Sequence, residues 1–171
     1  PQPCPPRPGN DPIAEFRELL TDSLRLRLRS DVPVGVTLSG GLDSSALTCL
    51  ATSAGNGSNQ LQAFTAVYSD HGYSEEAFAA MAATKARARH VLIRPESTDL
   101  PRDWDEFVRV VEAPFPSLSY FSNWEVYHAI RSANVKVVLS GQGGDELLLG
   151  YPRYRVPLIF FCLHRREWRR A

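Results

Sequence analysis

The residues best suited to chemistry form a turn rich in glycine, serine and aspartate, Ser39-Gly40-Gly41-Leu42-Asp43-Ser44-Ser45. The apolar residues 32–38 before it predict a buried strand, and residues 46–51 after it predict a helix that ends near Gly55. A strand, a glycine-rich turn and a helix in this order point several backbone N–H groups at one anion. Glycines let the backbone approach a phosphate, serine hydroxyls add donors, and an aspartate can hold a divalent cation. The turn is neither a G-x-G-x-x-G fingerprint nor a Walker motif, because no lysine closes it.

A second glycine-rich motif follows residues 135–139, which predict another strand. It reads Ser140-Gly141-Gln142-Gly143-Gly144-Asp145-Glu146-Leu147 and closes with Gly150-Tyr151. Its acidic pair lies at the end of a strand, where open α/β sheets bind their ligands. An alternative remains for both motifs: a Gly-Gly turn is often only a tight connection, and its Asp or Ser a helix N-cap.

Together the two motifs resemble the PP-loop and the SGxGGDE loop of the N-type ATP pyrophosphatases, and within that group the synthetase domain of glutamine-dependent asparagine synthetases. Residues 30–36 also fit the lead-in of that domain, so the resemblance covers most of residues 11–155. It implies an α/β fold of the adenine nucleotide alpha hydrolase type, with a parallel sheet flanked by helices and a truncated C-terminus. It also implies ATP and Mg²⁺ as cofactors. In this family the aspartate carboxylate attacks the ATP α-phosphate, and ammonia then displaces AMP from the acyl-AMP intermediate.

The same resemblance assigns residues to roles. Asp43 and Asp145 are expected to face magnesium, and Asp145 is also expected to serve catalysis. The residues expected to bind the nucleotide are Thr37, Leu38, Ser39, Gly40, Gly41, Asp43, Ser44, Ser45, Ala66, Val67, Ser140 and Gly141. For the apolar members of this set, core packing explains the residue type equally well.

Gln142 departs from the family pattern, which commonly has a carboxylate at this position to handle a proton when ammonia attacks. A glutamine amide does not titrate in the useful range, so Gln142 cannot act as a general base. Several alternatives stay open: amide formation slows or uses another acceptor, Gln142 orients the substrate, or Glu146 or Glu112 supplies the carboxylate. Helix-end or surface positions explain both glutamates as well.

The expected enzyme is therefore an ATP-dependent ligase that makes asparagine from aspartate. One alternative is a related amide-forming cyclase of the lasso-peptide or β-lactam type, and another is a nucleotide-binding remnant without turnover. The family's catalytic lysine would lie beyond Ala171, and no glutaminase domain precedes the motifs. Cys4 stands in a proline-rich lead and is interpreted as incidental. The chain is thus expected to be a fragment, with a glutaminase domain on a missing part or on another chain.

Composition gives no sign of nucleic-acid or membrane binding, and a cytoplasmic location is expected; the small-molecule substrates are what the resemblance implies. Lysine plus arginine equals aspartate plus glutamate at 19 each, so no net charge favours nucleic acid or an acidic partner. Cys4, Cys49 and Cys162 are far apart, which indicates a reducing compartment and neither a disulfide framework nor a zinc site. No apolar run has membrane-spanning length, and no secretory signal is visible.

Three segments are expected: a proline-rich lead at 1–12, the ATP-binding domain at 13–155 and an incomplete segment at 156–171 with a solvated basic end. Periodicity predicts a helix after Pro12. The alternating Leu and Arg of residues 24–29 could form a strand on pattern alone, but the family resemblance favours a continued helix there. Further helices are predicted at 75–89 with Ser74 as N-cap, at 101–111 and at 122–132, and further strands at 61–68 and 90–93. The order βαβαβααβ predicts a parallel sheet.

Overall fold

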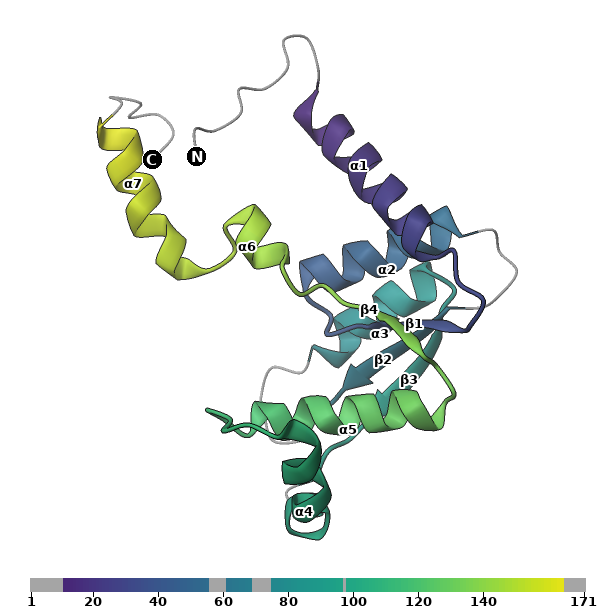
Figure 1. Cartoon of the computed structure of the whole chain (residues 1–171). Coiled ribbons are helices and arrows are strands. Elements are labelled where there is room, and N and C mark those ends of the chain that lie inside the picture. Colours follow the sequence, from purple (N-terminus) through teal and green to yellow (C-terminus); the bar gives the residue numbers. More distant parts are fainter. Residues whose placement is uncertain (1–10, 56–60, 69–74, 97, 165–171) are drawn as a thin grey trace. The chain divides into compact units, whose positions relative to one another are not determined.

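The computed structural model describes residues 11–55, 61–68, 75–96 and 98–164. Its contacts divide the chain into two compact units, Pro1–Ser140 and Gly141–Ala171. Within the described residues, the first unit contains one four-stranded sheet in the order β3-β2-β1-β4, and all its pairings are parallel (Figure 1). The strands are β1 Val34–Thr37, β2 Gln62–Ala66, β3 Arg89–Ile93 and β4 Val137–Leu139. The expected α/β fold with a parallel sheet is confirmed.

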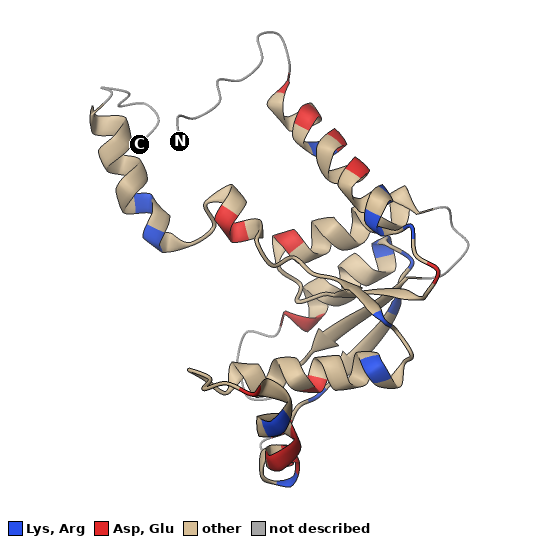
Figure 2. Ribbon diagram, viewed as in Figure 1, with Lys and Arg blue, Asp and Glu red and all other residues tan. Residues whose placement is uncertain are grey.

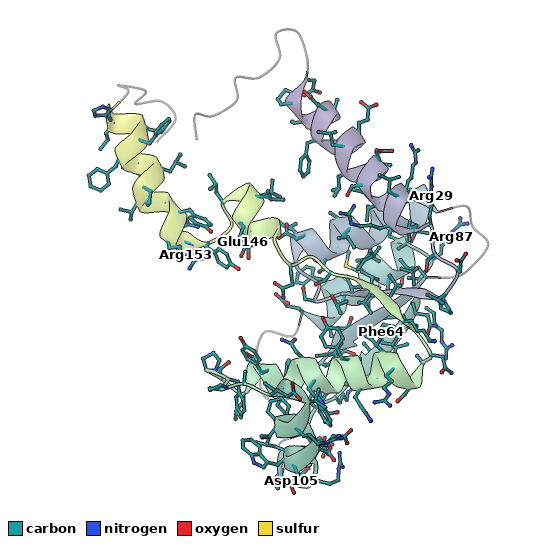
Figure 3. All side chains as sticks on the ribbon, viewed as in Figure 1. Arg29, Phe64, Arg87, Asp105, Glu146 and Arg153 are labelled. Carbon is teal, nitrogen blue, oxygen red and sulfur yellow. The ribbon has the colours of Figure 1, made fainter. Side chains whose placement is uncertain are left out.

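Helices cover both faces of this sheet (Figure 1). One face carries α1, α2 and α3, which are Pro12–Arg27, Leu42–Ala54 and Glu76–Lys85. The other face carries α5, Ser119–Ser132, which also packs against α4, Asp99–Val111. Neighbouring residues of β2 separate the two cores, because alternate side chains of a strand point to opposite faces. Ala63 belongs to the first core and Phe64 to the second, and Figure 3 shows Phe64 between the sheet and α5.

Helix α1 resolves the ambiguity of the alternating Leu and Arg residues. Asp11 caps the helix by accepting a hydrogen bond from Ile13 N at 3.0 Å, and Pro12 occupies the first turn. Leu20, Leu24 and Leu28 pack together against the first core, with Leu24 only 2% exposed. This spacing of four buries one stripe of a helix, whereas a strand would bury alternate residues.

Helix α3 ends earlier than predicted. The sequence predicts a helix to Arg89, but α3 stops at Lys85 and Arg89 begins β3. The reason is a Schellman motif built without glycine: Arg87 has φ +51°, Arg87 N donates to Thr84 O, and Ala88 N donates to Ala83 O. The predicted start of the preceding helix is also wrong, because α2 begins at Leu42 and includes Asp43, Ser44 and Ser45 in its first turns.

Aromatic rings join α4 to α5. Phe107 on α4 is fully buried. Its ring centroid lies 5.0–6.2 Å from those of four other aromatic residues, Trp104, Phe115, Phe121 and Trp124. The outer side of α4 carries charges of both signs (Figure 2), and Arg102 forms ion pairs with Asp99 and Asp103. Helix α4 is therefore fixed by its aromatic face, since exposed ion pairs contribute little.

Among the described residues, Oε1 of Glu125 on α5 is the one buried side-chain nitrogen or oxygen atom without a hydrogen-bond partner. Burial raises the pKa of its carboxyl, and the carboxylates of Asp99 and Asp103 raise it further. We expect Glu125→Gln to raise the melting temperature at pH 7 by about 1–2 °C, because an uncharged amide is less costly to bury. Thermal unfolding followed by circular dichroism measures this shift.

The pH dependence of that gain checks its cause. A raised folded-state pKa means that the native Glu125 binds a proton more readily than the unfolded one. Wild-type stability therefore recovers as the pH falls through the folded pKa, and the difference between the variants should vanish near pH 4.5. Exposed Glu18→Gln on α1 is the control and should leave the melting temperature unchanged. A gain at Glu125 that stays constant down to pH 4 would contradict this explanation.

The second unit contains α6 Gly144–Leu148, a 3-10 turn at Pro152–Tyr154 and α7 Arg155–His164. Neither α6 nor the 3-10 turn was predicted from the sequence. The Tyr151 hydroxyl donates to Glu146 Oε1 at 3.1 Å, and the Arg153 guanidinium lies over the Tyr151 ring at 4.7 Å. Among the described helices, none is both long and apolar enough to span a bilayer.

Some expectations concern residues outside the described part of the chain. These are the lead up to Asn10 with Cys4, the Ser74 cap and the basic end at 165–170. The described cysteines, Cys49 and Cys162, are free thiols. The segment boundaries expected from the sequence, at residues 12 and 155, stay a prediction.

Candidate functional site

The first motif leaves β1 through a turn that requires glycine. Gly40 has φ +96°, a backbone conformation that is strained for any residue with a Cβ atom. A Cβ at Gly40 would also lie 2.6 Å from Glu75 O and 3.1 Å from Ala79 N, at the start of α3. Gly41 is less restricted, with φ −66° and only Ser39 Oγ near its Cβ position at 3.4 Å. The turn is therefore pressed against α3 at Gly40.

Hydroxyl groups hold the inside of this turn. Ser44 Oγ accepts from Ser39 N and donates to Gly41 O, both at 3.2 Å, and lies 3.0 Å from Ser39 Oγ. Ser39 Oγ in turn accepts from Gly41 N at 3.2 Å. Ser44 is only 7% exposed, whereas Ser39 is exposed. Ser44 therefore shapes the turn from within, and Ser39 is on the side open to a ligand.

The beginning of α2 is available to an anion. Its N-cap is Gly41, which provides no side-chain cap, and Ser45 N donates to Gly41 O as the first helical bond. The N–H groups of Leu42, Asp43 and Ser44 precede this bond and so have no acceptor within α2. The helix dipole also favours negative charge here. These donors fit phosphate oxygens, and the half-buried Asp43 carboxylate in the first turn fits Mg²⁺ on such a phosphate.

The sheet order places the first residues of the two motifs, Ser39 and Ser140, at a topological switch point. From β1 the chain moves outward to β2 and β3, then returns to β4 on the other side of β1. Val36 of β1 pairs with Leu139 of β4, so both strands end at the same edge. Ser39 and Ser140 follow those ends, and open α/β sheets bind ligands at such points.

The second motif is described within its own unit. Gly143, with φ +93°, is the N-cap of α6, and Asp145 lies in the first turn of that helix. Gly150 N donates to Asp145 O at 3.0 Å, and a Cβ on Gly150 would collide with Asp145 Oδ1. Glycine at 150 therefore leaves room for this carboxylate. Gln142 is exposed.

The capping alternative for the two aspartates is not supported. The N-caps of α2 and α6 are Gly41 and Gly143, and neither helix has a side-chain cap bond. No cluster of three or more potential metal-ligating His, Cys, Asp or Glu residues occurs among the described residues. Mg²⁺ in phosphoryl sites keeps several waters and uses one or two carboxylates plus phosphates, so a sparse protein ligand set fits it.

Four of the residues expected to bind the nucleotide lie at strand ends, and they differ in what their backbone can offer. Leu38 is 1% exposed, its N donates to Phe64 O, and its carbonyl accepts from Thr65 Oγ1. Val67 is 8% exposed and its N donates to Ile93 O at 2.8 Å. Thr37 and Ala66 are half-buried. Both the N–H and the carbonyl of Leu38 are therefore occupied by hydrogen bonds within the fold.

Two residues near β1 had no signal in the sequence. Thr65 Oγ1 lies 2.6 Å from Leu38 O and 2.8 Å from His90 Nε2. Burial lowers the pKa of His90, an effect that Glu76 partly opposes. Neither residue belongs to a local motif, so only the pairing of β1, β2 and β3 could reveal the contact.

Glu112 is the exposed C-cap of α4. It therefore lies at a helix end, as one of the alternatives for this glutamate predicted.

Two solved structures that share this fold are NAD synthetases. A glutamine-dependent NAD⁺ synthetase from Acinetobacter baumannii, in complex with ADP, superposes with a TM-score of 0.59 at 22% identity, covering 86% of this chain and 29% of that one. An NH3-dependent NAD synthetase from Campylobacter jejuni gives a TM-score of 0.54 at 18% identity, covering 83% and 62%. The sheet and its first turn therefore define the PP-loop adenine nucleotide alpha hydrolase fold.

Sequence comparison narrows the class. Residues 15–168 match the family described as asparagine synthase, and the chain belongs to that family. Asparagine synthetase [glutamine-hydrolyzing] 1 of Bacillus subtilis is 34% identical over 150 residues, covering 85% of this chain and 22% of that protein. Amidase chyE of Penicillium rubens is 30% identical over 159 residues, covering 86% and 24%. The chain thus spans about a quarter of the length of these relatives.

Proposed function

We propose that this chain binds ATP with Mg²⁺ at Ser39–Ser45 and forms the ATP-binding part of an asparagine synthetase. The reaction joins the side-chain carboxylate of aspartate to the α-phosphorus, releases pyrophosphate, and then replaces AMP with ammonia. The observation that carries the proposal is the uncapped start of α2 behind the constrained Gly40 turn, at the switch point of the sheet. Membership of the asparagine synthase family supports the choice of reaction.

Each group in the first motif has a distinct task in this proposal. The N–H groups of Leu42 and Asp43 and the Ser39 hydroxyl hold the pyrophosphate end, while Ser44 maintains the turn. Asp43 would hold Mg²⁺, which supplies neutralising charge for the phosphate oxygens. Asp145, in the second unit, is proposed for the same role on the family resemblance alone. Chemistry of this kind depends on positioning and charge, so a rigid turn suits it.

The amide-forming step needs a base other than Gln142. Attacking ammonia must lose a proton, and an amide side chain cannot accept it. Glu146 is already the acceptor for the Tyr151 hydroxyl, so its carboxylate is positioned by that bond. We assign Gln142 to orienting the substrate. A glutaminase domain as ammonia source and a cytoplasmic location are parts of the same proposal.

A second candidate is an amide-forming enzyme that uses another carboxylate. Gln142 favours it, because it removes the carboxylate that an asparagine synthetase commonly has in this motif. A relative named as an amidase, from Penicillium rubens, also matches this chain at 30% identity and covers about as much of it as the asparagine synthetase does. Dependence of pyrophosphate release on aspartate separates the two candidates.

The decisive experiment is calorimetric titration of the chain with ATP, with and without magnesium. Asp43→Asn should weaken the binding of Mg-ATP by about tenfold to a hundredfold, because one charge-assisted contact is lost. It should leave the weaker magnesium-free binding unchanged. Asp105→Asn on exposed α4 is the matched control and should bind as the wild type does.

Two results would count against the proposal. If a folded wild-type chain binds no Mg-ATP, the proposed nucleotide site does not exist. Equal affinities of the wild type and Asp43→Asn for Mg-ATP would show that Asp43 does not hold magnesium. When binding is present, an assay of pyrophosphate release with and without aspartate follows.

A further inference from the structure

A polar contact, buried at Leu38 and Thr65 and half-buried at His90, joins three neighbouring strands where β1 leads into the first motif. It consists of Leu38 after β1, Thr65 on β2 and His90 on β3, and we call these three residues the strand-end clamp. Thr65 is 1% exposed, with Oγ1 2.6 Å from Leu38 O and 2.8 Å from His90 Nε2. The 2.6 Å contact is at the short end of the range for hydroxyl donors.

The chemistry of the atoms gives the direction of both bonds. A carbonyl oxygen can only accept, so the Thr65 hydroxyl donates its hydrogen to Leu38 O. The oxygen of that hydroxyl then accepts from His90, which must carry its hydrogen on Nε2. The bonds therefore run from His90 through Thr65 to Leu38, and each donor in the clamp has an acceptor.

The clamp acts on the peptide that leads into the phosphate-binding turn. The paired register of β1 and β2 ends at Thr37 and Phe64, and Leu38 N adds one more bond to Phe64 O. The Thr65 hydroxyl holds the carbonyl of the same Leu38, so both polar groups of that residue are fixed. Ser39 is the next residue, and Gly40 is already pressed against α3.

Fixing Leu38 matters because the turn's donors must point at one anion. A cradle held in its binding shape loses less conformational entropy when the ligand arrives, and needs no rearrangement. Gly40 at α3 restrains the middle of the turn, and the clamp restrains its entrance. A threonine whose only task was to fill the core would be replaceable by valine of similar shape.

We propose that Thr65 and His90 are positioning residues that hold the entrance of the Ser39–Ser45 turn in the shape that receives ATP phosphates. This inference rests on the proposed function for its ligand, but the restraint of the turn can be measured without any nucleotide. The variants are Thr65→Val, which removes only the hydroxyl, Thr65→Ser, which restores it, and His90→Gln, which keeps a donor. Thr52→Val on α2 is the control, since it removes a partly buried threonine hydroxyl away from the turn.

The first measurement is amide hydrogen exchange of the nucleotide-free chain, resolved by peptide. Thr65→Val should speed exchange in residues 38–46 by about fivefold or more, and should leave α5 at the wild-type rate. Thr65→Ser and His90→Gln should exchange close to the wild type. Equal rates at 38–46 in Thr65→Val and Thr52→Val would overturn the inference, and so would an increase spread evenly over the whole chain.

The second measurement separates this inference from the proposed function. When the wild type binds Mg-ATP, Thr65→Val should weaken that binding about fivefold to tenfold, while Thr52→Val should bind as the wild type does. Equal ATP affinities in Thr65→Val and the wild type would overturn the inference. A wild type that binds no ATP defeats the proposed function, and the inference then stands or falls on the exchange rates alone.

Discussion

Gly40→Ala is expected to lower the free energy of unfolding by about 3 kcal/mol and to abolish detectable ATP binding. The backbone strain of a side chain at φ +96° contributes about 1–2 kcal/mol. The rest comes from overpacking, because the new Cβ would stand 2.6 Å from Glu75 O, a backbone atom that cannot rotate away. Relieving this contact moves the turn away from α3, so the phosphate donors lose their arrangement. Urea unfolding and calorimetry with Mg-ATP measure the two effects.

Two glycines of the same chain serve as controls for Gly40. Gly143 has nearly the same φ, +93°, but nothing lies within 4 Å of its Cβ position. Gly143→Ala should therefore show the strain alone, about 1–2 kcal/mol. Gly41→Ala has an ordinary φ and should be close to neutral for stability. Equal losses at Gly40 and Gly143 would show that the contact with α3 has no energetic weight.

Phe107→Ala is expected to destabilise the chain by about 3–5 kcal/mol. Phe107 is 0% exposed at the centre of the rings between α4 and α5, and its removal leaves a cavity that rigid aromatic neighbours cannot close. In a chain of this size the loss corresponds to a fall in melting temperature of about 10 °C. Thermal unfolding by circular dichroism measures it.

The neighbouring Val108→Ala is the control for Phe107, since Val108 is on the same helix and 42% exposed. It should lower stability by less than about 1 kcal/mol. A similar loss in both variants would mean that the aromatic cluster around Phe107 gives α4 no particular stability. Because α5 packs on β2 and β3, a partial loss of α4 should leave the sheet and the first motif intact.

Elements with local signals were predictable. The helix after Asp11-Pro12 and the strands before both motifs carry caps, periodicity and turn residues in their own sequence. The end of α3 was not, because its Schellman motif uses Arg87 where a glycine would have been expected. Helix α6 was missed as well, since five residues inside a glycine-rich motif show no helical periodicity.

The candidate site also combines features that the local sequence predicts with features that it does not. Asp43, Asp145 and the glycines of both motifs were selected as candidates from the sequence, and their roles stay a prediction. What Leu38 does with its backbone could not be found, because its carbonyl is held by Thr65, a residue 27 positions away. The Thr65–His90 contact likewise spans 25 positions, and nothing in either local sequence marks it.

The amino-acid sequence alone carries the two turns, their glycines and aspartates, and the strand that precedes each of them, because such features depend on residues within a few positions of one another. Only the tertiary structure decided that β1 and β4 are neighbours, that Gly40 meets α3, and that Thr65 and His90 hold Leu38. These relations join residues distant in the chain. They are selected by packing the two faces of the sheet against their helices, and the energy of that packing belongs to the whole unit rather than to any segment.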